Sequence, residues 1–142
     1  MRLLSIGGAV ALALTLVASG SSARNPSFAF GRVGGNIQPY TVKISSSGAL
    51  SRVGPVALRN PDKRLSSAAL ARLLALAVDK RFFALPRHIS CAGSLPDFAS
   101  MFVTVSTATR TKTVFVRGGC NARFEAVLTG LETAAGVPVS QR

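Results

Sequence analysis

The two cysteines of this chain, Cys91 and Cys120, are the only ones that it has, and they flank a stretch that alternates like a β-hairpin. Between them lie segments 98–106 and 111–117, in which apolar and polar residues alternate with the period of half-buried strands. The break at 107–110 predicts a turn. Because a hairpin brings its outer ends together, we expect the two cysteines to meet there. The pattern predicts a disulfide, with two buried free thiols as the alternative.

Each strand of the predicted hairpin has one apolar face. In the first strand this face contains Met101, Val103 and Val105, and in the second it contains Val114 and Val116. A disulfide that closes a loop of about 30 residues stabilises a fold by about 3–4 kcal/mol, because the cross-link restricts the unfolded chain. We therefore expect the hairpin and its disulfide to be a main source of stability.

The first residues predict export. Arg2 supplies a positive charge, residues 3–17 are apolar and rich in Leu and Ala, and Ser21–Ala23 fits a small-x-small cleavage site. We predict that residues 1–23 are a signal peptide, with an uncleaved anchor as the alternative, and that no transmembrane span remains after cleavage. The expected location is secreted, periplasmic or at the cell envelope. The remaining residues, 24–142, are enough for one globular domain.

Helix signals occur at two places in this domain. Ser66 and Asn121 are suited to accept a hydrogen bond from the first turn of a helix, and each precedes apolar residues at helical spacing. Gly136 and Pro138 supply the end of the second helix. The apolar positions are Leu70, Leu73, Leu74, Ala77 and Val78 in the first helix, and Phe124, Val127, Leu128 and Leu131 in the second.

The order of the elements predicts an α+β fold. Further strands are expected at 28–33, 40–45 and 49–53, the last two joined by a turn that contains Gly48. Two hairpins, each followed by a helix, predict an antiparallel sheet of four to five strands with both helices packed on one face, in the order ββ(β)-α-ββ-α.

The charge of the chain is strongly positive, at +12. Such a charge allows binding to an anionic envelope polymer, although a basic surface that only keeps the protein solvated is the simpler interpretation. Nucleic acid is not expected as a partner, because one Tyr and no Trp are available for base stacking. The bases that would form an anion-binding patch are Arg52, Arg59, Lys63, Arg64, Lys80 and Arg81.

No catalytic or cofactor motif is evident, and we predict neither an enzyme nor a cofactor or metal site. His88 is the only histidine. It could act with Cys91 as a dyad, or form a zinc site with Cys91 and Cys120, but an exported chain is expected to use both cysteines in a disulfide.

Three stretches together resemble emfourin-like proteins, small bacterial inhibitors of thermolysin-type metalloproteases. Phe30–Gly35 resembles their strand that opens onto Gly-Gly. Leu65–Leu74 with Phe82–Pro86 is similar to their helix and its exit, and Asp97-Phe98 is similar to their strand entry. The resemblance spans about residues 28–135. The paired cysteines equally resemble exported bacterial domains of unknown function with the same order of elements.

The resemblance implies a compact domain that binds another protein, such as a secreted protease, without catalysing a reaction itself. It carries over no inhibitory residue. Exposure and turn chemistry identify the loops that we expect to contact such a partner. Their residues are Gly34, Gly35, Asn36, Ser46, Ser47 and Gly48.

Overall fold

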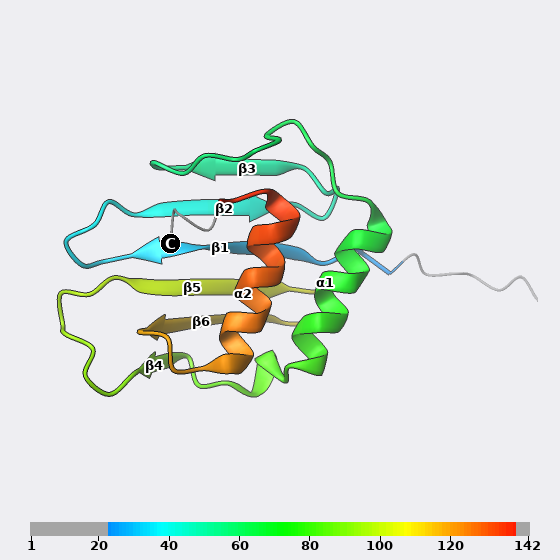
Figure 1. Ribbon diagram of the computed structural model, residues 1–142. Helices are drawn as coiled ribbons and strands as arrows, with labels where there is room; N and C mark the ends of the chain where they lie inside the picture. The colour runs from blue at the N-terminus through cyan, green and yellow to red at the C-terminus, as the bar shows by residue number, and fades with distance from the viewer. Residues whose placement is uncertain (1–22, 139–142) are drawn as a thin grey trace, which may run out of the picture.

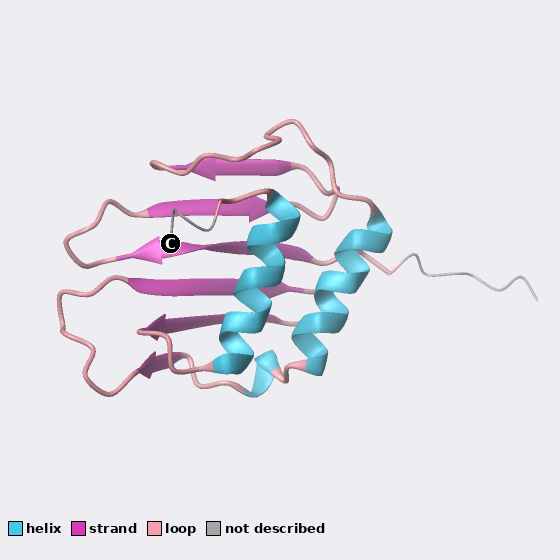
Figure 2. Cartoon of the chain, viewed as in Figure 1, coloured by secondary structure: helices cyan, strands magenta, loops and turns pink. Residues whose placement is uncertain are grey.

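The computed structural model describes residues 23–138, and these form a six-stranded sheet with two helices on one face (Figures 1 and 2). The predicted signal peptide, apart from Ala23, lies outside the described residues. No helix within 23–138 has the length and apolarity to cross a bilayer. The elements are β1 (Ser27–Val33), β2 (Tyr40–Ile44), β3 (Leu50–Val53), α1 (Ser67–Asp79), a 3₁₀ turn η1 (Phe82–Ala84), β4 (His88–Ser90), β5 (Ser100–Ser106), β6 (Thr111–Arg117) and α2 (Ala122–Ala135).

The α+β class and the two helices agree with the prediction, but the sheet differs from it. Its strand order is β3-β2-β1-β5-β6-β4, and β4 runs parallel to β6, so the sheet is mixed and has six strands. No strand was predicted at the residues of β4. The reason is physical: β4 has three residues, too few for alternation to be visible, and Gly93 and Pro96 follow it closely.

The two predicted hairpins are joined through their first strands. β1 pairs with β2 on one side and with β5 on the other, in both cases antiparallel. Phe30 therefore lies between Val42 of β2 and Val103 of β5. β1 is a central strand of the sheet, although it is the first strand of the described residues.

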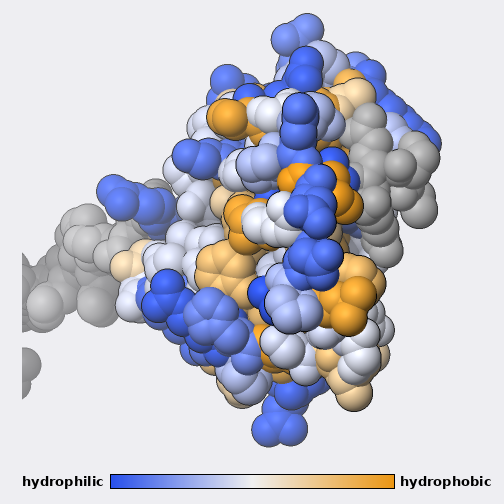
Figure 3. Space-filling view, turned by 90° about the vertical axis from the view of Figure 1, so that its left-hand side faces the viewer, coloured by the Kyte–Doolittle hydropathy of each residue, from blue (hydrophilic) through white to orange (hydrophobic). Residues whose placement is uncertain are grey.

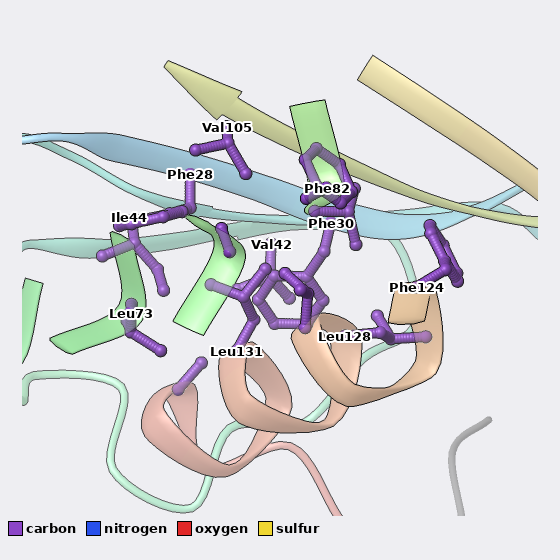
Figure 4. Packing of buried hydrophobic residues seen from close by; sticks show 14 of the residues in the cluster. Phe28, Phe30, Val42, Ile44, Leu73, Phe82, Val105, Phe124, Leu128 and Leu131 are labelled. Atoms are coloured by element: carbon purple, nitrogen blue, oxygen red, sulfur yellow. The ribbon is translucent and has the colours of Figure 1, made fainter. Parts of the chain in front are cut away.

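The core lies between the sheet and the helices. The predicted apolar faces of β5 and β6 point toward the helices, with Val103, Val105, Val114 and Val116 buried. Figure 4 shows Leu73 of α1 and Leu128 and Leu131 of α2 directed toward the strands. Phe82 of η1 is also fully buried in this layer, so it closes the core where α1 ends.

Both predicted helix caps are present. The Ser66 hydroxyl accepts from the N–H of Ala69 at 3.1 Å, and the Asn121 side chain accepts from the N–H of Phe124 at 2.9 Å. Two helical positions differ from the expected pattern. Val78, assigned to the apolar positions of the first helix, is 53% exposed, whereas Glu132, a charged residue, is 4% exposed. Glu132 follows the buried Leu128 by four residues, and this spacing places it on the buried side of α2.

Among residues 23–138 no helix covers the second face of the sheet, and a row of rings crosses part of it. The rings of His88 and Phe115 are stacked with centroids 5.1 Å apart, and the Phe115 and Phe102 centroids are 5.9 Å apart. The row ends at Gly31, which pairs with Phe102 and has no side chain of its own. Phe102 is only 9% exposed, because its ring lies over this glycine.

We predict that Gly31→Ala destabilises the protein by about 2–3 kcal/mol, as expected for overpacking. The new Cβ would overlap the carbonyl oxygen of Tyr40 and would lie 3.1 Å from Cε1 of Phe102. Gly119→Ala is the control, because a Cβ there would meet no heavy atom within 4 Å. Urea denaturation measures both. If Gly31→Ala lowers the free energy of unfolding no more than Gly119→Ala does, this account of the row is contradicted.

Candidate functional site

The disulfide predicted from the sequence is present between Cys91 and Cys120, with their Cα atoms 5.6 Å apart. The route by which the cysteines meet was not predicted. Cys91 follows β4, and Cys120 comes three residues after β6. These two strands are parallel neighbours, so both finish at the same end of the sheet. The N–H of Cys91 also donates to the carbonyl of Arg117 at 2.9 Å. The added strand thus brings Cys91 to its partner.

The site is formed by three of the connections at this end of the sheet, on the left in Figure 1. They are residues 34–39 between β1 and β2, residues 91–99 between β4 and β5, and residues 118–121 between β6 and α2. The disulfide links the second connection to the third. The first two are linked by hydrogen bonds instead.

Asn36 and Asp97 make these bonds. The Asn36 backbone N–H donates to the Asp97 carbonyl at 3.2 Å, and its side-chain amide donates to the Asp97 carboxylate at 3.4 Å. Arg32 contacts both ends of the turn between β1 and β2. Its Nε donates to the carbonyl of Gln38 at 3.0 Å, and its guanidinium lies 5.1 Å from the centre of the Tyr40 ring. These contacts hold the loops in one arrangement.

A cleft of about 440 Å³ opens between the joined loops. Ile37 and Phe98 lie on it and are 51% and 49% exposed, so each presents a large apolar side chain to solvent. Figure 3 views this end of the molecule, where orange apolar residues interrupt the blue surface. The cleft is lined by Arg32, Asn36, Ile37, Asp97, Phe98, Ala99, Met101 and Gly118.

A second hollow of about 340 Å³ lies beside the disulfide and shares Phe98 and Gly118 with the cleft. Leu95, which is 54% exposed, belongs to the same region, because its carbonyl accepts from the N–H of Phe98 at 3.0 Å. Phe98 therefore lies between two hollows. We use the name loop-end surface for the cleft-lining residues together with Leu95 and the disulfide.

The predicted partner-binding loops do not form one surface. Gly34, Gly35 and Asn36 belong to the connection on which the loop-end surface is built. The other loop lies at the opposite end of β2, and its contacts are internal. Gly48 is buried, with its carbonyl accepting from the N–H of Leu65 at 2.8 Å.

Ser46 and Ser47 of that second loop are exposed, although the Ser47 carbonyl accepts from the guanidinium of Arg64 at 3.2 Å. The residue types of both loops are typical of turns, so both were predicted as partner-binding loops. Residue type does not show that the two loops lie at opposite ends of β2. The two loops can therefore contact one compact partner surface only from opposite ends of the domain.

The exposed apolar residues of the loop-end surface were not identified from the sequence. Phe98 was assigned to a strand, and Ile37 and Leu95 were given no role. The signal that was available is their type: they are large apolar side chains in stretches whose other residues are small, polar or Pro. Such residues in loops are candidates for contact with a partner.

The six bases proposed as an anion-binding patch are divided into two groups. Arg52 is on β3, and Arg59, Lys63 and Arg64 lie on the connection that follows it. Lys80 and Arg81 come after the last turn of α1. This helix has 13 residues, so its two ends lie about 20 Å apart, and the connection that carries the first group leads into its start. Two members also have contacts within the chain: Arg52 donates to the carbonyl of Val56, and Lys80 pairs with Asp79 at 3.3 Å.

His88 is exposed and stacks on Phe115, as described for the uncovered sheet face. The thiols proposed as its catalytic or zinc-binding partners are joined in the disulfide, so neither is free to act with it. Within residues 23–138 there is no cluster of three or more His, Cys, Asp or Glu side chains suited to a metal ion.

Comparisons with known proteins add no assignment: no family model, no curated protein and no solved structure matches this chain. The class is therefore defined by the fold and the site alone. It is an α+β domain with one helical layer on a six-stranded mixed sheet and a disulfide-linked loop-end surface.

We predict that replacing both cysteines, in Cys91→Ser with Cys120→Ser, lowers the free energy of unfolding by about 3–4 kcal/mol, since the disulfide closes a loop with a sequence separation of 29. Urea denaturation of the variant and of the oxidised protein measures the difference. The wild-type protein under reducing conditions should match the variant. A loss below about 1 kcal/mol would mean that the disulfide contributes little to stability.

We predict that Gly35→Ala separates the two loops, whereas Gly34→Ala does not. Both glycines have a positive φ, so both variants carry the backbone strain of about 1–2 kcal/mol. Only at Gly35 would the new Cβ also lie 2.5 Å from the N of Ala99 and 2.6 Å from the carbonyl of Asp97. The readout is amide exchange at Asn36, which should become faster in Gly35→Ala alone. Equal exchange in the two variants would show that the loops are not held by this contact.

Proposed function

We propose that this protein is an exported, non-catalytic domain that binds another protein through its loop-end surface. The observation that supports the proposal is the placement of Phe98, which is 49% exposed and lines both hollows at this end. Aromatic residues that sit beside pockets and are surrounded by polar groups are typical anchors of protein interfaces.

The surroundings of Phe98 fit this role. Ile37 and Leu95 add exposed apolar area, and Arg32, Asn36 and Asp97 supply polar groups around the cleft. The disulfide and the bonds between Asn36 and Asp97 restrict the loops before a partner arrives. A restricted surface loses less conformational entropy on binding, which favours affinity.

A secreted thermolysin-type metalloprotease is the first partner to test. This choice rests on the resemblance of Phe30–Gly35, Phe82–Pro86 and Asp97-Phe98 to emfourin-like inhibitors. If the domain inhibits such an enzyme, the loop-end surface would enter the enzyme's cleft with Phe98 as the leading apolar side chain. Inhibition is a narrower proposal than binding, and each has its own assay.

Export is part of the proposal. Residues 1–23 have the pattern of a signal peptide, and a disulfide persists in oxidising compartments outside the cytoplasm. A partner should therefore be sought among secreted and envelope proteins.

The alternative function is binding to an anionic polymer of the cell envelope, which the net charge of +12 favours. The division of the six proposed bases into two groups weakens this alternative relative to the loop-end surface. The two functions differ in salt dependence, because binding to a polyanion weakens steeply with added salt, whereas an apolar anchor is less affected.

We predict that Phe98→Ala weakens binding of an envelope or secreted partner by about 30-fold, as expected for loss of an interface anchor. The matched control is Val78→Ala, which removes a side chain of similar exposure from α1. Residues 24–142, which include every described helix and strand, are immobilised in oxidised form and challenged with secreted and envelope fractions through a salt-wash series. Inhibition of a thermolysin-type protease is measured with the same proteins.

The result expected is a partner that wild type and Val78→Ala retain through high salt and that Phe98→Ala loses. Equal retention by all three proteins would contradict the assignment of the loop-end surface. Loss of every bound component at moderate salt would favour the envelope polymer instead. Failure to inhibit at high molar excess would exclude the inhibitor role for the proteases tested but leave the binding result standing.

A further inference from the structure

A second candidate binding site lies beside the first residues of β6. The loop-end surface lies at the other end of that strand. The second site is a hollow of about 240 Å³, lined by Arg87, Thr111, Lys112 and Thr113. Two of these four residues are cationic and two carry hydroxyl groups. No carboxylate is among the lining residues.

A further positive charge adjoins this hollow. Arg110 precedes β6 directly, and its guanidinium lies 3.5 Å from the centre of the Phe83 ring in η1. Bases that precede β4 and that lie at the start of β6 therefore converge here, a grouping that the sequence order did not suggest.

The backbone at this edge is oriented for pairing. The N–H of Phe115 donates to Arg87 and the carbonyl of Arg117 accepts from Cys91, so alternate residues of β6 direct both backbone groups away from β5. By the same alternation, Thr111 and Thr113 direct their N–H and C=O groups toward the outer edge. β4 pairs with β6 only over Phe115–Arg117, which leaves these groups beyond the start of β4.

The pairing of the side chains agrees with this orientation. Thr113 lies opposite Thr104 of β5, and their hydroxyls are 2.8 Å apart. Residues opposite each other in the pairs that exchange no backbone bonds have the shorter Cα separation, which suits such a contact. Thr111 and Thr113 thus offer an unpaired length of strand with Arg87 and Lys112 beside it.

We propose that an acidic, extended segment of another protein binds here by adding a strand to β6 at Thr111–Thr113. Backbone groups of the segment would pair with the outward N–H and C=O groups of the two threonines. Its carboxylates would contact Arg87, Lys112 and Arg110. Strand addition at an exposed edge derives affinity from main-chain hydrogen bonds and specificity from the flanking side chains.

Charge decides between the candidate occupants. A second copy of this chain would bring a net charge of +12 and the same cationic edge, so edge-to-edge self-pairing is repelled. A phosphate polymer would satisfy the cations but would leave the strand-like array of backbone N–H and C=O groups only partly paired. An acidic peptide satisfies both kinds of group.

The test is a titration of isotope-labelled residues 24–142 with a short peptide of alternating glutamate and valine, followed by amide exchange. The expected result is slower exchange of the Thr113 amide, with binding abolished when alternate backbone nitrogens of the peptide are methylated. Arg87→Gln with Lys112→Gln should weaken binding about tenfold, since two surface ion pairs are lost. Arg59→Gln with Lys63→Gln removes the same charge elsewhere and should have little effect.

The proposal would be overturned by equal binding of the methylated peptide, by binding without protection of Thr113, or by no binding at millimolar peptide. Inorganic polyphosphate serves as the polymer probe. If it binds as tightly as the peptide and both pairs of substitutions weaken it equally, the basic edge is a general anion surface and strand addition is wrong. Because this edge is separate from the loop-end surface, Phe98→Ala should leave peptide binding unchanged.

Discussion

The antiparallel pairing of β1 with β5 is the contact on which both the core and the loop-end surface depend. It joins the two hairpins into one sheet along seven paired positions, from Ser27 with Ser106 to Val33 with Ser100. Without it the sheet would divide into two three-stranded parts, β3-β2-β1 and β5-β6-β4, and the helices would no longer cover one continuous apolar face. The same pairing places the connection after β1 beside the connection before β5, and the cleft lies where they meet.

The loop-end surface combines features that differ in origin. The disulfide acts mainly on the unfolded chain, whose freedom it reduces. The bonds between Asn36 and Asp97 act within the folded state, where they hold two loops together. Phe98 contributes to neither, since about half of its side chain faces solvent. An exposed aromatic side chain on a restricted surface is better suited to contact a partner than to stabilise the fold.

Much of the fold could be predicted because its signals are local. Alternation identified β5 and β6 with their inward faces, and Ser66 and Asn121 identified both helix starts. The disulfide was also predicted, although the argument relied on the hairpin alone. The parallel strand β4 was not predicted. Its three residues are too few to show the alternation of apolar and polar residues that is typical of a strand, and they pair with β6, which is distant in the sequence.

The site was less predictable for a related reason. A surface formed by three connections depends on which strand ends lie together, and turn residues such as Gly34 and Gly48 do not encode that. The six bases show the same limitation, since those on β3 and its following connection lie far from Lys80 and Arg81. The bases that do converge, Arg87 and Lys112, were not singled out because they are isolated in the sequence.

Protein binding through the loop-end surface is the central claim, and hydrogen exchange of the oxidised domain, alone and in complex with its captured partner, tests it most directly. The account predicts slower exchange in the complex at residues 34–39 and 92–99, with little change in the turn between β2 and β3. Protection confined to that turn, or to the connection that carries Arg59 and Lys63, would contradict it.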